Sequence, residues 1–182
     1  MKATGIVRRI DELGRVVIPK EIRRTLRIRK GDPLEIFTEK EELVLRKYSP
    51  ILSLDKNAKM VTDTIKEITG GLAILTDRDS VLSSSGEKGK EFEGKRLSSD
   101  MEKAMENRKS ILLNASEGSN ILPVYDGQET QYTSQAITPI LSAGETLGLI
   151  ILQTDKDNKV FTVQEVKIIQ SLSSFLAKQF EE

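Results

Sequence analysis

The hydrophobic pattern of the first 50 residues is short-range. Apolar residues cluster in 6–10 and 15–18, and the β-branched content of both runs predicts strands. Between the runs, the sequence Asp-Glu-Leu-Gly predicts a turn in which Gly14 takes a positive φ at no steric cost. Pro19 fits the first turn of a helix over 20–26, whose apolar face carries Ile22 and Leu26.

A hairpin is predicted next, with strands at 34–37 and 43–45 around the charged turn 39–42. Four short strands and one short helix bury too little surface to make a stable monomer. We therefore expect residues 1–50 to form an intimate dimer in which strands from both chains share one core.

Longer periodic segments follow the linker-like stretch Tyr48-Ser49-Pro50. Helical spacing and apolar runs predict helices at 54–68, 97–107 and 163–180 and strands at 72–75, 81–82, 111–113, 134–141 and 147–154. Residues 83–90 are small and polar and predict a mobile loop. Residues 53–182 thus indicate an α/β domain framed by its first and last helices. Those helices either only cover the sheet or also form a second dimer interface, and the pattern favours neither alternative.

Composition narrows the function classes. The 182 residues are 37% hydrophobic and 31% charged, which is typical of a globular protein. We expect a cytoplasmic protein without a membrane partner, because no apolar run approaches a membrane span or a signal peptide. The absence of cysteine and histidine excludes disulfides, the usual zinc and haem ligands, cysteine nucleophiles and histidine bases. We expect no catalytic residues, no metal and no cofactor.

Charge is divided unevenly along the chain. The net charge is zero, but residues 1–30 contain ten basic and three acidic residues, a balance of +7, and the other 152 residues carry −7. A basic head on an acidic body favours a polyanion as partner. A merely solvated charged surface is the alternative for any short basic run, but here the basic residues lie within strand-like and turn-like patterns.

Four arginines of the head are suited to double-stranded DNA: Arg8 on the first strand, Arg15 after the turn, and Arg23 and Arg24 on the helix. Arginine can donate two hydrogen bonds to guanine in the major groove, and a dimer presents each arginine twice, which matches a palindromic site. A helix-turn-helix is excluded because only one short helix is available. Single-stranded nucleic acid is disfavoured because residues 1–36 contain no aromatic residue for stacking.

The sequence TGIVRRIDELGRVVIPKEIRRTLRI, residues 4–28, closely resembles the N-terminal motif of the AbrB family of bacterial transition-state regulators. The resemblance implies an α+β protein whose N-terminal domain is a domain-swapped β-hairpin dimer. It also implies DNA contacts from Arg8, Arg15, Arg23 and Arg24, with Lys2 and Arg9 contacting phosphates. A head of this length before a body of about 130 residues is most similar to the branch that regulates transcription in the developing forespore.

The same resemblance implies that residues 53–182 form a GAF-like α/β domain. Such a domain either takes an unidentified small-molecule effector or serves only in dimer formation, and both readings stay open. Asn158, Lys159, Phe161 and Glu165 partly resemble a signature of cyclic-nucleotide GAF domains, but the acidic pair is missing because Val166 follows Glu165. We therefore expect Phe161 to cap the start of the last helix.

The main hypothesis is a sequence-specific DNA-binding regulator of sporulation genes that assembles as a homodimer and then a homotetramer, a dimer of dimers. An antitoxin-like interaction protein is the alternative, since toxin–antitoxin systems reuse swapped-hairpin heads. Antitoxins usually carry a disordered tail, whereas this body has the apolar pattern of a folded domain.

Overall fold

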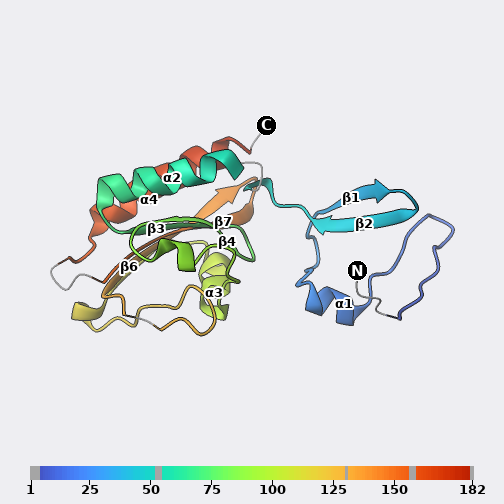
Figure 1. Ribbon diagram of the computed structural model, residues 1–182, viewed down its shortest axis with the longest axis horizontal. Coiled ribbons are helices and arrows are strands. Elements are labelled where there is room, and N and C mark those ends of the chain that lie inside the picture. The colour runs from blue at the N-terminus through green and yellow to red at the C-terminus, as the bar shows by residue number, and fades with distance from the viewer. Residues whose placement is uncertain (1–4, 52–54, 130, 156–158, 181–182) are drawn as a thin grey trace. The chain divides into compact units, whose positions relative to one another are not determined.

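The computed structural model describes residues 5–51, 55–129, 131–155 and 159–180. The chain divides into two compact units, Met1–Tyr48 and Ser49–Glu182, shown in Figure 1. None of the helices in these described ranges combines the length and the apolar character that crossing a bilayer requires.

The first unit, called the head below, contains one helix and one hairpin. Helix α1 spans Lys20–Thr25, and strands β1 (Leu34–Glu39) and β2 (Glu42–Lys47) pair antiparallel with Ile36 opposite Leu45. These elements confirm the predicted helix and the predicted hairpin. The turn at 11–14 is also confirmed, and Gly14 has a φ of 75°.

The two strands predicted at 6–10 and 15–18 are not formed in the single chain, where both segments have irregular backbone. The turn between them closes as in a hairpin, since the Asp11 amide donates to the Arg15 carbonyl oxygen at 3.1 Å. Beyond that turn the ladder does not continue. β-propensity measures how well residues fit a pleated, half-buried surface, and one copy of the head provides no such surface for Val7 or Val17.

Burial in the head is unusually low. Pro19 is its only buried residue among residues 5–48. Val7 is 87% exposed, Leu13 76% and Val17 73%. The other large apolar side chains that stay exposed in this unit are Ile6, Ile10, Val16, Leu26, Ile36, Phe37, Leu43, Leu45 and Tyr48. A stable monomer does not leave so many apolar side chains in water.

The second unit, called the body below, is built on one antiparallel sheet with strand order β4-β3-β7-β6-β5. Its helices and strands are α2 (Asp55–Thr69), β3 (Leu72–Thr76), β4 (Val81–Ser85), η2 (Gly89–Glu91), α3 (Ser99–Asn107), β5 (Ile111–Asn114), η3 (Ala115–Glu117), β6 (Ser134–Ser142), β7 (Glu145–Thr154) and α4 (Val163–Lys178).

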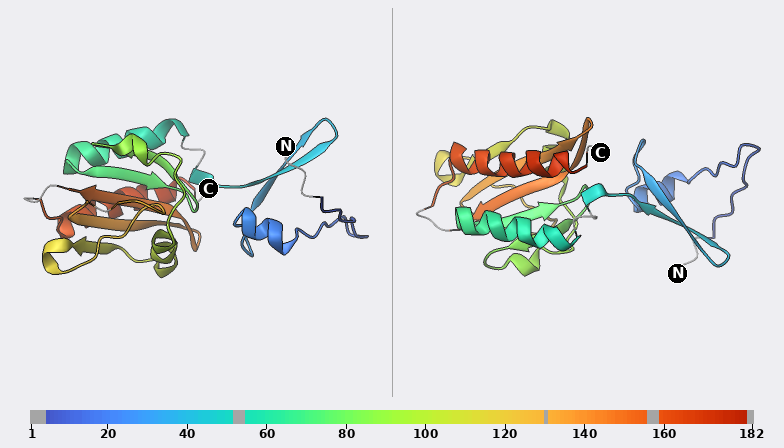
Figure 2. Two further views of the ribbon diagram at one scale, coloured as in Figure 1. Left: turned by 60° about the horizontal axis from the view of Figure 1, so that its bottom comes forward. Right: turned by 90° about the horizontal axis from the view of Figure 1, so that it is seen from above.

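Both faces of this sheet are covered. Helices α2 and α4 lie on one face and α3 lies on the other, as the views in Figures 1 and 2 show. Central strand β7 alternates accordingly: Ile150 and Leu152 join the core beneath α2 and α4, and Leu149 and Ile151 join the core beneath α3. The body therefore has two apolar cores separated by a nearly continuous apolar sheet.

The predicted loop at 83–90 is wrong at its start, because Ser83–Ser85 belong to strand β4 and are buried. Their hydroxyls are hydrogen-bonded to the main chain or to neighbouring side chains, as in the 2.6 Å bond from Ser84 Oγ to the Gly89 carbonyl oxygen. Small side chains allow α2 to pack over the strand, and Ser83 Oγ lies 3.0 Å from Thr62 Oγ1 on that helix.

The signature-like residues near the last helix have structural roles. Phe161 is 1% exposed in the core, and Glu165 accepts hydrogen bonds from the amide and the hydroxyl of Thr162, both at 2.7 Å. Thr162 and Glu165 thus form a capping box that starts α4. Partial burial opposes ionisation of Glu165, but these hydrogen bonds lower its pKa overall. Asn158 lies outside the described residues.

Candidate nucleic-acid interface

The turn before Arg15 is organised by one carboxylate. Asp11 Oδ1 accepts hydrogen bonds from the backbone amides of Leu13 (3.0 Å) and Arg15 (2.8 Å). Asp11 Oδ2 pairs with Arg15 Nε at 2.7 Å. The backbone and side-chain hydrogen bonds from Arg15 hold the pKa of Asp11 below its ordinary value of 3.8. The loop is therefore fixed by a side chain that the sequence analysis treated only as part of a turn.

Arg15 remains available despite this contact. Its side chain is 71% exposed, and the ion pair with Asp11 engages Nε. The planar guanidinium has five N–H donors, so two terminal nitrogens are left for a second partner. Asp11 thus restricts the orientation of Arg15 without consuming its capacity to bind.

Helix α1 positions Arg23 and Arg24. The carbonyl oxygen of Pro19 accepts the Arg23 amide at 2.9 Å, which makes buried Pro19 the anchor of the first turn. Ile22 is half-buried, whereas Arg23 and Arg24 are exposed. The helix stops after one and a half turns because Arg27 takes a positive φ of 52°. Two adjacent cations are thereby presented on a short, rigid support.

Contacts to the hairpin fix the end of this helix. Lys47 Nζ on β2 donates to the Arg27 carbonyl oxygen at 3.0 Å and lies 3.4 Å from Asp32 Oδ2. The same carboxylate oxygen accepts the Arg29 amide at 2.8 Å. Sequence reasoning missed Asp32 and Lys47, although the Gly-Asp-Pro break before β1 is typical of a carboxylate that bonds its own backbone.

The remaining candidates lie on the irregular N-terminal segment or outside the described chain. Arg8 and Arg9 are exposed, and Lys2 is outside the described residues. Throughout the described part of the chain, the side chains of Arg8, Arg9, Arg23 and Arg24 form no hydrogen bond or ion pair, so their charges are available to a polyanion. Among the candidates that the structure describes, Arg15 alone contacts another charged side chain, that of Asp11.

The described residues contain no cluster of three or more acidic side chains that could hold a metal ion.

Comparison with known proteins gives two family matches along the chain. A model described as "Stage V sporulation protein T C-terminal, transcription factor" matches residues 53–181. A model described as "Antidote-toxin recognition MazE, bacterial antitoxin" matches residues 7–53.

Relatives with known names agree with this division. The transition state regulatory protein AbrB of Bacillus subtilis is 47% identical over 76 residues, which are 42% of this chain and 78% of AbrB. The head is therefore AbrB-like. The GAF domain of a phosphoenolpyruvate-protein phosphotransferase from Acinetobacter is 16% identical, with a TM-score of 0.56 over 69% of this chain and 80% of that domain. The body therefore has a GAF-like fold.

One relative matches along the whole length. Stage V sporulation protein T of Bacillus subtilis is 42% identical over 183 residues, and the alignment covers all of both chains. Together with the model match over residues 53–181, this identity shows that the chain belongs to the stage V sporulation protein T family of transcription factors.

Proposed function

We propose that this protein is a sequence-specific DNA-binding transcription regulator of sporulation that works on double-stranded DNA in the cytoplasm. The proposal is carried by four exposed arginines, Arg8, Arg9, Arg23 and Arg24, which have no side-chain partner among the described residues of a head whose sequence is AbrB-like.

Within this proposal, the arginines divide by the kind of contact they make. Arg8, Arg15, Arg23 and Arg24 read base edges or adjacent phosphates, and Arg9 and Lys2 neutralise phosphates. Contacts to phosphate supply affinity through counterion release and contacts to bases supply sequence preference. The Asp11 clamp on Arg15 supports a base-reading role, because discrimination needs a fixed orientation.

A second copy of the head completes the fold as a swapped-hairpin dimer. The apolar residues of 6–18 and of the β1–β2 hairpin are exposed in one chain, and segments 6–10 and 15–18 have strand-forming sequences without a ladder. Pairing these segments between two chains would bury the exposed apolar residues and would also give the strand-forming segments a hydrogen-bonded ladder. It also presents every arginine twice about a two-fold axis, which fits a pseudo-palindromic DNA site.

The bodies pair through their covering helices, which gives a dimer of dimers. Helices α2 and α4 cover one face of the sheet and still expose Met60 (66%), Ile68 (60%) and Phe175 (58%). Linking two head dimers in one assembly raises the effective concentration of the second head near DNA and increases avidity without any new contact. The body is also the part that a small-molecule effector would address.

Genome-wide mapping of DNA bound by the full chain in sporulating cells tests the function. We expect bound sites with two-fold sequence symmetry near genes expressed in the forespore. The affinity of the purified chain for such a site should exceed its affinity for unrelated duplex by roughly 10³-fold or more at physiological salt. Equal affinity for both duplexes would contradict sequence-specific regulation.

An antitoxin-like role is the second candidate, because the antitoxin model matches residues 7–53. That match covers the head and ends at residue 53, and the body has two apolar cores in place of a tail that could wrap a toxin. Purification of the full chain from its native cells separates the two functions: a stoichiometric small toxin bound to the chain would favour the antitoxin.

A further inference from the structure

A groove of about 460 Å³ opens beside helix α4 on the body. Helix α4 packs mainly over strand β6 and only lightly over the edge strand β5, so the border of the sheet is left uncovered on this face. Gln170 and Ser174 of α4 line one side of the groove, and the turn 108–110 between α3 and β5 lines the other. Buried Thr138 and Pro139 of β6 lie between these two sides. The groove is therefore a gap in the helical cover of the sheet.

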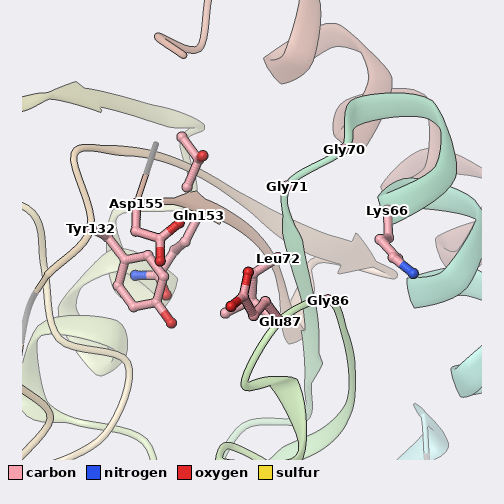
Figure 3. Close-up of a pocket in the computed structure, with 10 residues that line it drawn as sticks. Lys66, Gly70, Gly71, Leu72, Gly86, Glu87, Tyr132, Gln153 and Asp155 are labelled. Atoms are coloured by element: carbon pink, nitrogen blue, oxygen red, sulfur yellow. The ribbon is translucent and has the colours of Figure 1, made fainter. Parts of the chain in front are cut away.

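The charge of this groove distinguishes it from a second cavity of the body. That cavity, of about 210 Å³, is shown in Figure 3, where Glu87 and Asp155 line it together with Lys66. The groove beside α4 is instead lined by two cations, Arg108 and Lys109, and none of the described residues that line it is acidic. Residues 31–182 carry a net charge of −7, because the whole chain is neutral and residues 1–30 carry +7. A cationic groove on an acidic body favours an anionic ligand.

Both cations are available to a ligand. Arg108 and Lys109 are exposed, and within the described residues neither side chain forms a hydrogen bond or an ion pair. Arg108 ends α3 with a positive φ of 55°, and its amide donates to the Met105 carbonyl oxygen at 3.2 Å. The end of α3 thus fixes the backbone that carries the two cations. The planar guanidinium of arginine suits phosphate oxygens, which it can bind through two parallel hydrogen bonds.

A hydrogen-bond network provides a third donor. Ser110 Oγ accepts from Gln170 Nε2 at 2.9 Å and lies 3.0 Å from Thr138 Oγ1. Thr138 is 3% exposed, and no other acceptor within the described residues contacts its hydroxyl, so donation to Ser110 avoids a buried unsatisfied proton. Ser110 Oγ then accepts two hydrogen bonds, which occupy both of its lone pairs. The proton of the half-buried Ser110 hydroxyl is therefore left for an acceptor in the groove.

We propose that this groove binds a small phosphomonoester. A phosphomonoester carries nearly two negative charges at neutral pH, which match Arg108 and Lys109, and the Ser110 hydroxyl donates to a phosphate oxygen. The carbon part of the ligand lies along the exposed side chains of Gln170 and Ser174. DNA phosphates carry one charge each and match the pair of cations less well. The inference rests on the effector role proposed for the body and is independent of DNA binding by the head.

Calorimetric titration of the full chain with glucose 6-phosphate, AMP, inorganic phosphate and glucose tests the site. We expect at least one of the two monoesters to saturate at millimolar concentration or below and to shift the NMR resonances of the Lys109 and Ser110 amides. Inorganic phosphate should bind more weakly than that monoester, because it does not reach α4, and glucose should not bind. Absence of saturation by both monoesters, or glucose binding as tight as that of its phosphate, would overturn the proposal.

Matched variants locate the bound ligand. Arg108→Gln and Lys109→Gln each remove one charge from an exposed side chain, and each should weaken monoester binding roughly tenfold or more without lowering the thermal midpoint. Lys66→Gln removes the same charge at the second cavity and should bind the monoester as the wild type does. Equal weakening by Lys66→Gln, or unchanged binding by both groove variants, would show that the ligand does not occupy the groove.

Duplex DNA separates this site from the regulator function. The affinity of the ligand-free Arg108→Gln chain for its DNA site should equal that of the wild type. Loss of DNA affinity in that variant, or displacement of the bound monoester by unrelated duplex, would assign the groove to DNA phosphates and overturn the proposal. Normal DNA binding by a chain that binds no monoester would reject the groove site alone and leave the regulator function standing.

Discussion

At the residue scale, Asp11 couples the shape of a loop to the direction of a cation. Two backbone amides and one guanidinium nitrogen converge on its carboxylate, so the loop and Arg15 are ordered by the same group. Charge-assisted hydrogen bonds of this kind need the ionised form. The orientation of Arg15 therefore depends on the protonation state of a neighbouring residue.

This dependence predicts a pH effect confined to the turn. Because hydrogen bonds from Arg15 lower the pKa of Asp11, the stabilisation is complete above the ordinary value of 3.8 and is lost as the pH falls through the lower, folded-state pKa. NMR titration of the Leu13 and Arg15 amides should give a midpoint below 3.8. Asp11→Asn should remove the transition, and a wild-type midpoint at or above 3.8 would contradict the clamp.

Replacement of the arginines should cause two distinguishable kinds of loss in DNA affinity. Arg15→Ala, Arg23→Ala or Arg24→Ala should each weaken binding to the specific site by roughly 2–6 kcal/mol per dimer, taking about 1–3 kcal/mol for each base contact. Arg9→Ala should instead weaken specific and unrelated duplex equally and reduce the salt dependence. Affinity measured at several salt concentrations checks both.

Exposed Lys90 in the body provides the control, because Lys90→Ala removes the same charge outside the head. The DNA affinity of the Lys90→Ala variant should match that of the wild type. Unchanged binding by all three base-contact variants would refute the assignment.

At the element scale, the local sequence pattern was sufficient to predict the elements that contacts within one chain stabilise. Helix α1, the β1–β2 hairpin and strand β7 follow directly from the pattern of apolar residues. Strand β4 was predicted only at 81–82, because the three serines that follow carry no β-branched signal and their burial depends on hydrogen bonds to Thr62 and to residues of the following turn. The strands predicted at 6–10 and 15–18 are absent from the single chain for the opposite reason. Their sequences strongly favour strands, but a hydrogen-bonded ladder needs partner strands that one chain does not supply.

Substitution of Val17 tests whether the apolar residues of the head form a core that two chains share. In a single chain it is 73% exposed, so Val17→Asp would cost less than about 0.5 kcal/mol there. In a core shared by two heads, the same change buries an unpaired charge and should abolish both head dimerisation and DNA binding. Circular dichroism, solution mass and DNA affinity of the full chain measure these effects.

Val17→Thr keeps the β-branched shape without adding a charge, so it should retain most of the assembly. Full DNA binding by Val17→Asp would show that Val17 stays at the surface.

At the scale of the whole molecule, the two proposed interfaces differ in character. The head leaves its apolar residues exposed in a single chain, whereas the body has two apolar cores, and the large apolar side chains that its described residues expose are Met60, Ile68, Val160, Val163 and Phe175. Head pairing is therefore expected to be obligate and body pairing to be adjustable.

Phe175→Glu tests the body interface. Phe175 is 58% exposed on α4, so the change should leave the body folded while placing a charge in the helix-to-helix contact. The solution mass should fall from that of four chains to that of two, with the affinity of a single head dimer for one half of the DNA site retained. Lys178→Glu, a charge change at the end of the same helix, serves as the control. A mass unaffected by Phe175→Glu would exclude this face.

The sequence predicted the charged residues of the candidate site but not the contacts that hold them in place. Arg8, Arg15, Arg23 and Arg24 could be named because positive charge in a compact motif is visible in the sequence. The supporting contacts of Asp32 and Lys47 could not, since they join residues 15 apart through the fold.

The near absence of burial in the head has a consequence for timing in the cell. If two chains must meet before this unit gains its folding free energy, the amount of competent head rises with the square of the chain concentration when chains are scarce. Low, leaky synthesis would then yield mostly inactive chains, and activity would appear abruptly once production passes a threshold. The apolar residues exposed on each separate chain would thus prevent small fluctuations in synthesis from activating the regulator.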